Sequence, residues 1–307
     1  MNKMKLLMLL AVIALCTSCA SDDPSAESIF KNETSASDSE FDKWLSANYT
    51  EPYNIVFNYL YNDRLTNNSY NVVPASIEKS KAMAIMVKHI WLDAYVEAVG
   101  EQFMKENTFR EFQLIGSGQY SSGGSNEITL GYAENGIRVN LFRINELDID
   151  NIFVNQDAPF RDRMQYPMDL NYWYFHTMHH EFCHILTQKK SYDTDFQTIS
   201  AGQYHSVDWI NVKDIDAGKE GFVTGYASSE YNEDFAEVYA NYVTLSDEGW
   251  NTVLTNAGAA GAAVIAQKLD MVKSYFQNTW GIDLDDLREI VLRRSQEAAS
   301  LDLKNLK

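Results

Sequence analysis

Cysteine is scarce in this chain of 307 residues: there are three, and two of them, Cys16 and Cys19, lie within the first twenty residues. Cys183 is the one cysteine in the body of the protein. A single thiol cannot form an intramolecular disulfide, even in an oxidising compartment. The stability of the fold must therefore come from its hydrophobic core and from any metal that it binds.

Basic residues are also few, with 25 Lys and Arg against 43 Asp and Glu and a formal net charge of −18. A surface of this charge repels nucleic acids and other anionic polymers, so we expect no nucleic-acid partner. The sequence shows no internal repeat. After the N-terminus it also has no apolar run long enough to cross a bilayer, and the remaining hydrophobic content suits one large domain.

The one long apolar run stands at the N-terminus. Lys3 and Lys5 form a short basic segment, and residues 6–15 are apolar but too few to anchor stably across a bilayer. This pattern is typical of a secretory signal peptide. The acidic and Ser-rich segment that follows predicts a flexible tether up to about residue 38.

The end of the leader carries a lipidation signal. The small residues Thr17 and Ser18 before Cys19 resemble a bacterial lipobox, which would make residues 1–18 a lipoprotein signal peptide and Cys19 the acylated first residue. Asp22 and Asp23 resemble the surface-export signal of Bacteroidetes lipoproteins. The resemblance implies an outer-membrane lipoprotein that faces the cell exterior, with ordinary secretory cleavage as the alternative.

The strongest functional signal is His180-Glu181-x-x-His184 within a helix-like stretch. Residues four apart on a helix differ by about 40° around the axis and roughly 6 Å along it, so both imidazoles can reach one metal ion. Glu181 stands where its carboxylate can act on a water molecule without ligating the metal. The spacing predicts a zinc site with its own general base.

Two other pairs of residues four positions apart in this segment could also ligate a metal. His176 and His180 have the same spacing, but the residue after His176 is Thr177, which cannot serve as a base. We interpret His176 as a donor that supports the ligands or as a helix-packing residue. His179 with Cys183 is a further possible ligand pair, although it too lacks an adjacent base.

A third ligand must come from another segment, because catalytic zinc keeps three protein ligands and one open position. The metzincin extension is excluded, since Thr187 and Lys190 occupy its Gly and His positions. Glu233 and Glu237 share one face of a predicted helix. One can ligate zinc while the other accepts a proton from a ligand imidazole, and their spacing alone permits either assignment.

Asn232-Glu233-x-x-Ala236-Glu237 resembles the gluzincin pattern, in which the first Glu is the third zinc ligand and the later one supports the ligands. Tyr226 stands seven residues before Glu233, a spacing similar to that of anthrax lethal factor and the Pro-Pro endopeptidases. The resemblance implies that Glu233 ligates zinc, that Glu237 supports the ligands without contacting the metal, and that Tyr226 stabilises the oxyanion of the reaction. These motifs cover about residues 170–245.

With its N-terminus, the chain most resembles the substrate-import-associated zinc metallohydrolase lipoproteins of Bacteroidetes. That family implies Zn²⁺ as cofactor, a membrane attachment through the lipid, and as partners a TonB-dependent importer and its glycan-binding lipoprotein. It also implies a zincin-like fold.

The predicted fold is α+β: a helix-rich, zincin-like catalytic domain over residues 39–307 with a small mixed sheet, after the signal peptide at 1–18 and the acylated tether at 19–38. The order helix, small sheet, metal helix and second metal helix supports this class. The expected elements are a long helix at 76–105, strands at Glu111–Ile115, Glu127–Tyr132 and Ile137–Phe142, the metal helix at 169–189, the Glu233 helix, and helices at 259–279 and 283–300.

Together these features predict a zinc-dependent hydrolase, most simply a cell-surface metallopeptidase that cleaves peptides or proteins. The alternative is a non-catalytic surface accessory of a nutrient importer with a structural or vestigial zinc site. Glu181 favours the enzyme, because a structural site has no use for a base beside its ligand.

Overall fold

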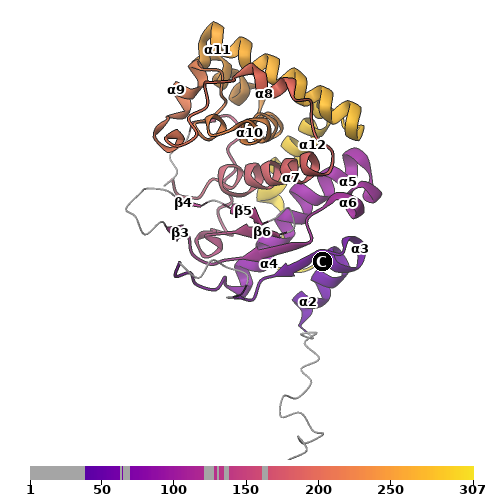
Figure 1. Ribbon diagram of the computed structural model, residues 1–307. Helices are drawn as coiled ribbons and strands as arrows, with labels where there is room; N and C mark the ends of the chain where they lie inside the picture. The colour runs from indigo at the N-terminus through magenta and orange to yellow at the C-terminus, as the bar shows by residue number, and fades with distance from the viewer. Residues whose placement is uncertain are drawn as a thin grey trace, which may run out of the picture. The chain divides into compact units, whose positions relative to one another are not determined.

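The computed structural model describes residues 39–62, 64, 70–120, 128–129, 131–134, 138–160 and 165–307 (Figure 1). The chain divides into two compact units, Met1–Asp42 and Lys43–Lys307, and the second contains every strand and every helix from α3 (Glu51–Tyr53) onward. The expected signal peptide, Cys19 and the tether lie outside the described residues. Within the described part of the chain, no helix combines the length and apolar character that crossing a membrane requires.

A small mixed sheet forms one layer of the second unit. Its strand order is β1-β2-β6-β5, where β1, β2 and β6 run parallel and β5 pairs antiparallel with β6. Two short strands, β3 and β4, pair separately. The strands are β1 (Val56–Asn58), β2 (Glu111–Leu114), β3 (Gln119–Tyr120), β4 (Ile128–Thr129), β5 (Gly131–Glu134) and β6 (Arg138–Leu141).

The sheet agrees with the predicted α+β class and corrects two details. The strand expected at Glu127–Tyr132 is divided between β4 and β5, and β1 was not expected. Three residues of β1 carry little periodic signal, because a strand this short shows barely one alternation. Its partner β2 supplies the stability, since Phe112 and Leu114 are fully buried.

The long helix expected at 76–105 is broken into pieces. It runs as α4 (Ile77–Met86), a π-helical stretch at Val87–Leu92 and α5 (Asp93–Val99), and then ends at Gly100. Gly100 has φ of 89°, a left-handed backbone that glycine adopts without steric cost. The chain restarts there as α6 (Glu101–Asn107) in a new direction.

An aromatic cluster fixes the metal helix to this part of the core. The Trp91 ring stacks on Phe109 at 4.9 Å between centroids and meets the Phe182 ring edge-on at 5.3 Å. Phe182 lies on α7 (His176–Lys189), which continues from a π-helical stretch at Asn171–Phe175, so the helix predicted at 169–189 is confirmed. Phe182 stands two positions after His180, slightly more than half a turn, so burying Phe182 directs His180 away from the cluster.

Helices that follow α7 in the chain cover its other side, and one of them carries the second half of the site. In Figure 1, α10 lies between α7 and α11, and α10 also packs against α12. The helix expected at 259–279 begins earlier, at Asp247, and bends at Gly258 (φ 68°). The other helices are α2 (Glu40–Leu45), α3 (Glu51–Tyr53), α8 (Asp195–Ile199), α9 (Asp214–Lys219), α10 (Tyr231–Thr244), α11 (Asp247–Tyr275) and α12 (Leu284–Gln296).

A buried ion pair joins α10 to α11 and to the segment before α10. Lys268 Nζ lies 2.6 Å from Asp234 Oδ2 and 2.8 Å from the carbonyl oxygen of Gly221, and both charged side chains are fully buried. The hydroxyl of Tyr204 donates to the same Asp234 oxygen at 2.9 Å. These contacts hold the loop that precedes α10 against the helix.

Candidate metal centre

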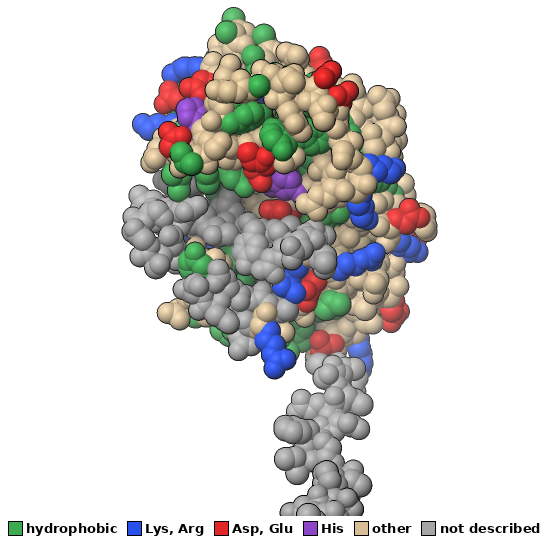
Figure 2. All heavy atoms as spheres, in the orientation of Figure 1, with side chains coloured by type: hydrophobic (Ala, Val, Ile, Leu, Met, Phe, Trp, Pro, Cys, Tyr) green, Lys and Arg blue, Asp and Glu red, His purple; other side chains and the backbone are tan. Residues whose placement is uncertain are grey.

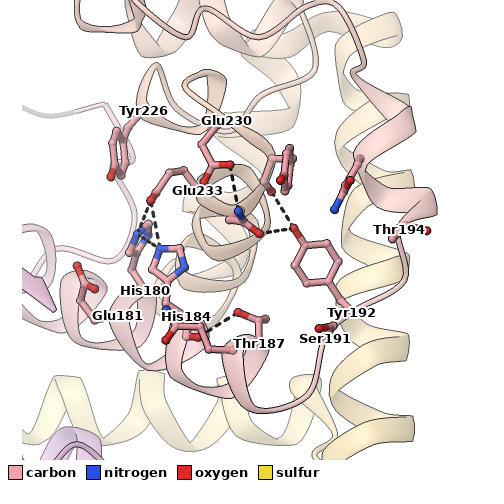
Figure 3. A pocket seen from close by; sticks show the side chains of 14 residues that line it. His180, Glu181, His184, Thr187, Ser191, Tyr192, Thr194, Tyr226, Glu230 and Glu233 are labelled. Carbon is pink, nitrogen blue, oxygen red and sulfur yellow. Dashed lines mark hydrogen bonds and ion pairs between the residues drawn. The ribbon is translucent and has the colours of Figure 1, made fainter. Parts of the chain in front are cut away.

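Three metal-ligating side chains converge where α7 faces α10 (Figure 3). His180 Nε2 lies 2.9 Å from Glu233 Oε2, and His184 Nε2 lies 3.2 Å from the same oxygen. The two imidazole nitrogens are 3.0 Å apart. Among the described residues, this is the group of His, Cys, Asp and Glu side chains placed to share one cation.

The local sequence of α10 explains why Glu233 is available there. The side chain of Glu230 caps the helix by accepting from the backbone N–H of Glu233 at 3.3 Å. Glu233 is therefore in the first turn, with its side chain directed toward α7. The apolar residues of α10, among them Phe235 and Val238, are buried as the periodicity predicted and fix the rotation of the helix.

The geometry fits zinc. Tetrahedral zinc binds imidazole nitrogen and carboxylate oxygen at roughly 2.0–2.2 Å, which places its donor atoms about 3.3 Å from one another. The three distances here, 2.9, 3.0 and 3.2 Å, are close to that value. Two neutral imidazoles and one carboxylate form the donor set of a catalytic zinc site.

The electrostatics of the site favour positive charge. Burial opposes charging of His180, but its hydrogen bonds with Glu233 and Glu237 hold its pKa well above the usual value. Burial likewise opposes charging of Glu233, yet its hydrogen bonds with His180 and His184 hold its pKa well below the usual range. The carboxylate is thus kept ionised and ready to bind a cation.

Glu237 lies behind the three converging side chains rather than among them. Its Oε1 is 2.8 Å from His180 Nδ1 and 3.3 Å from His176 Nε2. Burial works against its ionisation, but the charge of His176 and the hydrogen bond with His180 outweigh it and lower the pKa of Glu237 to about 2. A carboxylate on the far nitrogen of a ligand imidazole fixes the tautomer and orients the ring toward the metal.

Two polar residues that sequence reasoning missed hold Glu237 in place. The hydroxyl of Thr224 donates to Glu237 Oε2 at 2.7 Å, and Asn241 Nδ2 lies 3.3 Å from the same oxygen. Asn241 stands four residues after Glu237, so helical spacing alone could have found it. Thr224 lies in a loop, and no periodic signal marks it.

The structure also brings Glu181 and Tyr226 to the site. Both line a pocket of about 580 Å³ that opens at the metal centre. The Tyr226 ring lies 5.7 Å from the His180 ring between centroids, on the side of Glu233 away from His184 (Figure 3). Burial, the negative charge of Glu233 and a hydrogen bond with it raise the pKa of Tyr226, so its phenol remains a protonated donor.

His179 and Cys183 lie apart from the metal centre. His179 Nδ1 is 2.8 Å from the hydroxyl of Tyr95, which also hydrogen-bonds to the hydroxyl of Tyr239. Burial lowers the pKa of His179 to about 3 and raises the pKa of the Cys183 thiol. The two residues form part of the buried packing, and they are absent from the converging group.

The pocket opens on the face of the molecule drawn in Figure 2, where a histidine and acidic side chains lie side by side in the hollowed middle. Its described lining is largely polar and extends from the metal centre toward Tyr192, three residues after the end of α7. A substrate can therefore approach the ligands from solvent.

Comparison with known proteins agrees with this geometry. The model of a family described as "Putative zinc-binding metallo-peptidase" matches residues 34–285. A solved structure titled as a putative zinc-binding metallo-peptidase from Bacteroides caccae is 41% identical, with a TM-score of 0.71. The similarity covers 87% of this chain and 95% of that one. No curated protein matches the chain. The chain therefore belongs to this family of zinc-binding metallopeptidases.

Proposed function

We propose that this protein is an active zinc-dependent peptidase whose reaction is carried by His180, Glu181, His184, Glu233 and Tyr226. The observation that carries the proposal is Glu181, a carboxylate next to a ligand and on the wall of the pocket where three metal-ligating side chains converge. A purely structural zinc site is closed and needs neither a base nor a pocket.

In this mechanism each residue has one task. Zinc held by His180, His184 and Glu233 would supply Lewis acidity, lowering the pKa of a water molecule and polarising the scissile carbonyl. Glu181 would take the proton of the attacking water and later deliver it to the leaving amine. The Tyr226 hydroxyl would donate to the developing oxyanion. Glu237 and His176 would keep the His180 ring in orientation.

A direct test is a library of short peptides incubated with purified, zinc-loaded protein that lacks residues 1–19. We expect cleavage of an internal peptide bond, detected by mass spectrometry of the products. Complete stability of every peptide, with zinc bound and the protein folded, would favour a binding accessory of an importer instead.

Replacing Tyr226 by phenylalanine should lower kcat about 10²- to 10³-fold with little change in KM, because one oxyanion donor is lost only in the transition state. Steady-state kinetics on a cleaved peptide measure the change. Tyr166→Phe is the control, since this exposed tyrosine lies outside the pocket lining. An unchanged kcat in Tyr226→Phe would show that Tyr226 serves only to pack against Trp209, since the centroids of the two rings lie 4.9 Å apart.

We further propose that the protein is attached to the outer membrane through acylated Cys19 and faces the cell exterior, where an importer is a natural partner. The basic and apolar leader and the lipobox-like residues before Cys19 support this location. Cys19→Ala should shift the protein from the membrane fraction to the soluble fraction and abolish labelling by a fatty acid, because the acyl acceptor is gone. Equal labelling of the variant would implicate Cys16.

A further inference from the structure

The pocket wall beyond Glu233 is polar and carries no positive charge. It is formed by Tyr192, Glu230 and Asn232, together with Thr194 and Gln197 from the segment around α8. Among the described lining residues there is no Lys or Arg and no aliphatic side chain. The apolar surface of the described lining is limited to tyrosine rings, and the other side chains of this wall offer a substrate polar or charged partners.

The hydrogen bonds along this wall run in one direction. The hydroxyl of Tyr192 donates to Asn232 Oδ1 at 2.9 Å, and Asn232 Nδ2 donates to Glu230 Oε2 at 3.1 Å (Figure 3). The Tyr192 ring is held in place by stacking on Phe235 at 4.1 Å between centroids. The Tyr192 hydroxyl and one Asn232 N–H are used within this chain of bonds, and the one charged group on the wall is the Glu230 carboxylate, which can accept further hydrogen bonds from a substrate.

The structural role of Glu230 is to cap α10, and this role does not require a negative charge. Its side chain caps α10 through a long bond of 3.3 Å to the N–H of Glu233 and accepts from Asn232, and both donors are neutral. Short side chains such as Ser, Thr, Asp and Asn are the usual caps, and a neutral acceptor would serve as well.

We propose that this wall receives a cationic group of the peptide substrate, an ammonium or a guanidinium, close to the scissile bond, and that Glu230 selects it. Such a group supplies the positive charge that the wall lacks and several N–H donors for the Glu230 carboxylate. The formal net charge of −18 adds a field that attracts cationic peptides. The inference rests on the peptidase function proposed above and names its substrate class.

The test compares peptides that differ only in Lys or norleucine, which has the same carbon chain without the ammonium. We expect a cleavage profile enriched in Lys or Arg at one position near the cleaved bond. In Glu230→Gln, the ratio of kcat/KM for the Lys peptide over the norleucine peptide should fall about 10-fold or more, the value of a charged hydrogen bond. Acetylated and free N-termini distinguish a side-chain cation from the terminal amine.

Two further variants test whether Glu230 acts by direct contact with the substrate cation or only through the overall charge of the protein. Asp193→Asn is the matched control, because Asp193 also accepts a backbone N–H near a helix start, at 2.9 Å from Asp195 N, but lies outside the pocket lining. It should leave the ratio unchanged. Thr194→Lys places a competing cation on the exposed rim of the pocket and should lower the ratio as Glu230→Gln does. Circular dichroism and zinc content confirm that each variant is folded and loaded.

Binding provides a readout that does not depend on turnover. Calorimetry with the zinc-loaded Glu181→Gln variant should show tighter binding of the Lys peptide than of the norleucine peptide. Cleavage without any preference for Lys or Arg, a ratio unchanged in Glu230→Gln, or a preference for acidic residues would overturn this inference while leaving the peptidase intact. Neither cleavage nor binding of any peptide would overturn the peptidase and the inference together.

Discussion

Glu181→Gln should lower kcat about 10²- to 10⁴-fold while zinc content and thermal stability stay at the level of the parent. The amide has the size of the carboxylate but cannot accept the proton of the attacking water, so only the proton transfer is lost. Because Glu181 is not one of the three side chains placed to share a cation, the variant should keep its metal. Steady-state kinetics on a cleaved peptide and metal analysis of the same sample measure both quantities.

The control for this variant is Asp193→Asn, which makes the same change of charge outside the pocket lining. Its kcat should match that of the parent. Hydrolysis by Glu181→Gln within a few-fold of the parent would remove Glu181 from the reaction. Loss of zinc in that variant would instead show that Glu181 takes part in holding the metal.

Removal of a zinc ligand should have the second large effect, and it distinguishes Glu233 from Glu237. Glu233→Ala, His180→Ala and His184→Ala should lose zinc at low free metal, since each removes one of three donor atoms. Glu237→Ala should retain zinc with an affinity about 10- to 100-fold lower, because Glu237 contacts the far nitrogen of His180. Hydrolysis should fall in parallel with bound zinc.

Zinc titration followed by calorimetry measures these affinities, and thermal unfolding gives an independent value. Zinc at about 100 times its Kd should stabilise the parent by about 2.7 kcal/mol, and variants that do not bind should gain nothing. Circular dichroism checks that each variant is folded before zinc is added. A larger loss of affinity in Glu237→Ala than in Glu233→Ala would reverse the assignment of the two glutamates.

The sequence predicted those parts of the site that depend on local spacing. Helical geometry alone places His180, Glu181 and His184 on one side of α7, and the same periodicity places Glu233 and Glu237 together on α10. Local signals also predicted α12 and strands β2 and β6. These elements follow from short-range backbone geometry, which the neighbouring residues determine.

Spacing could not rank the two glutamates. Both lie on one face of α10, and the resemblance to gluzincins favoured Glu233. The structure separates them by distance: Glu233 approaches the Nε2 atoms of both histidines, whereas Glu237 approaches His180 Nδ1. The position of α10 along α7 determines which glutamate contacts Nε2 of the histidines and which contacts Nδ1 of His180. Packing of buried residues such as Phe182 and Val238 decides that position.

Sequence by itself therefore determined the chemistry available to this protein: two histidines with an adjacent base, two candidate carboxylates, an acidic composition and a single cysteine after residue 19. Tertiary structure decided the rest. It brought Glu233 to His184 across 49 residues, placed Thr224 behind Glu237, and put Tyr192, Asn232 and Glu230 in one line beside the pocket. Such contacts join helices and loops that are far apart in the sequence. The positions of these elements are fixed by the packing of buried side chains from distant segments, and no local sequence pattern encodes the distance between two elements.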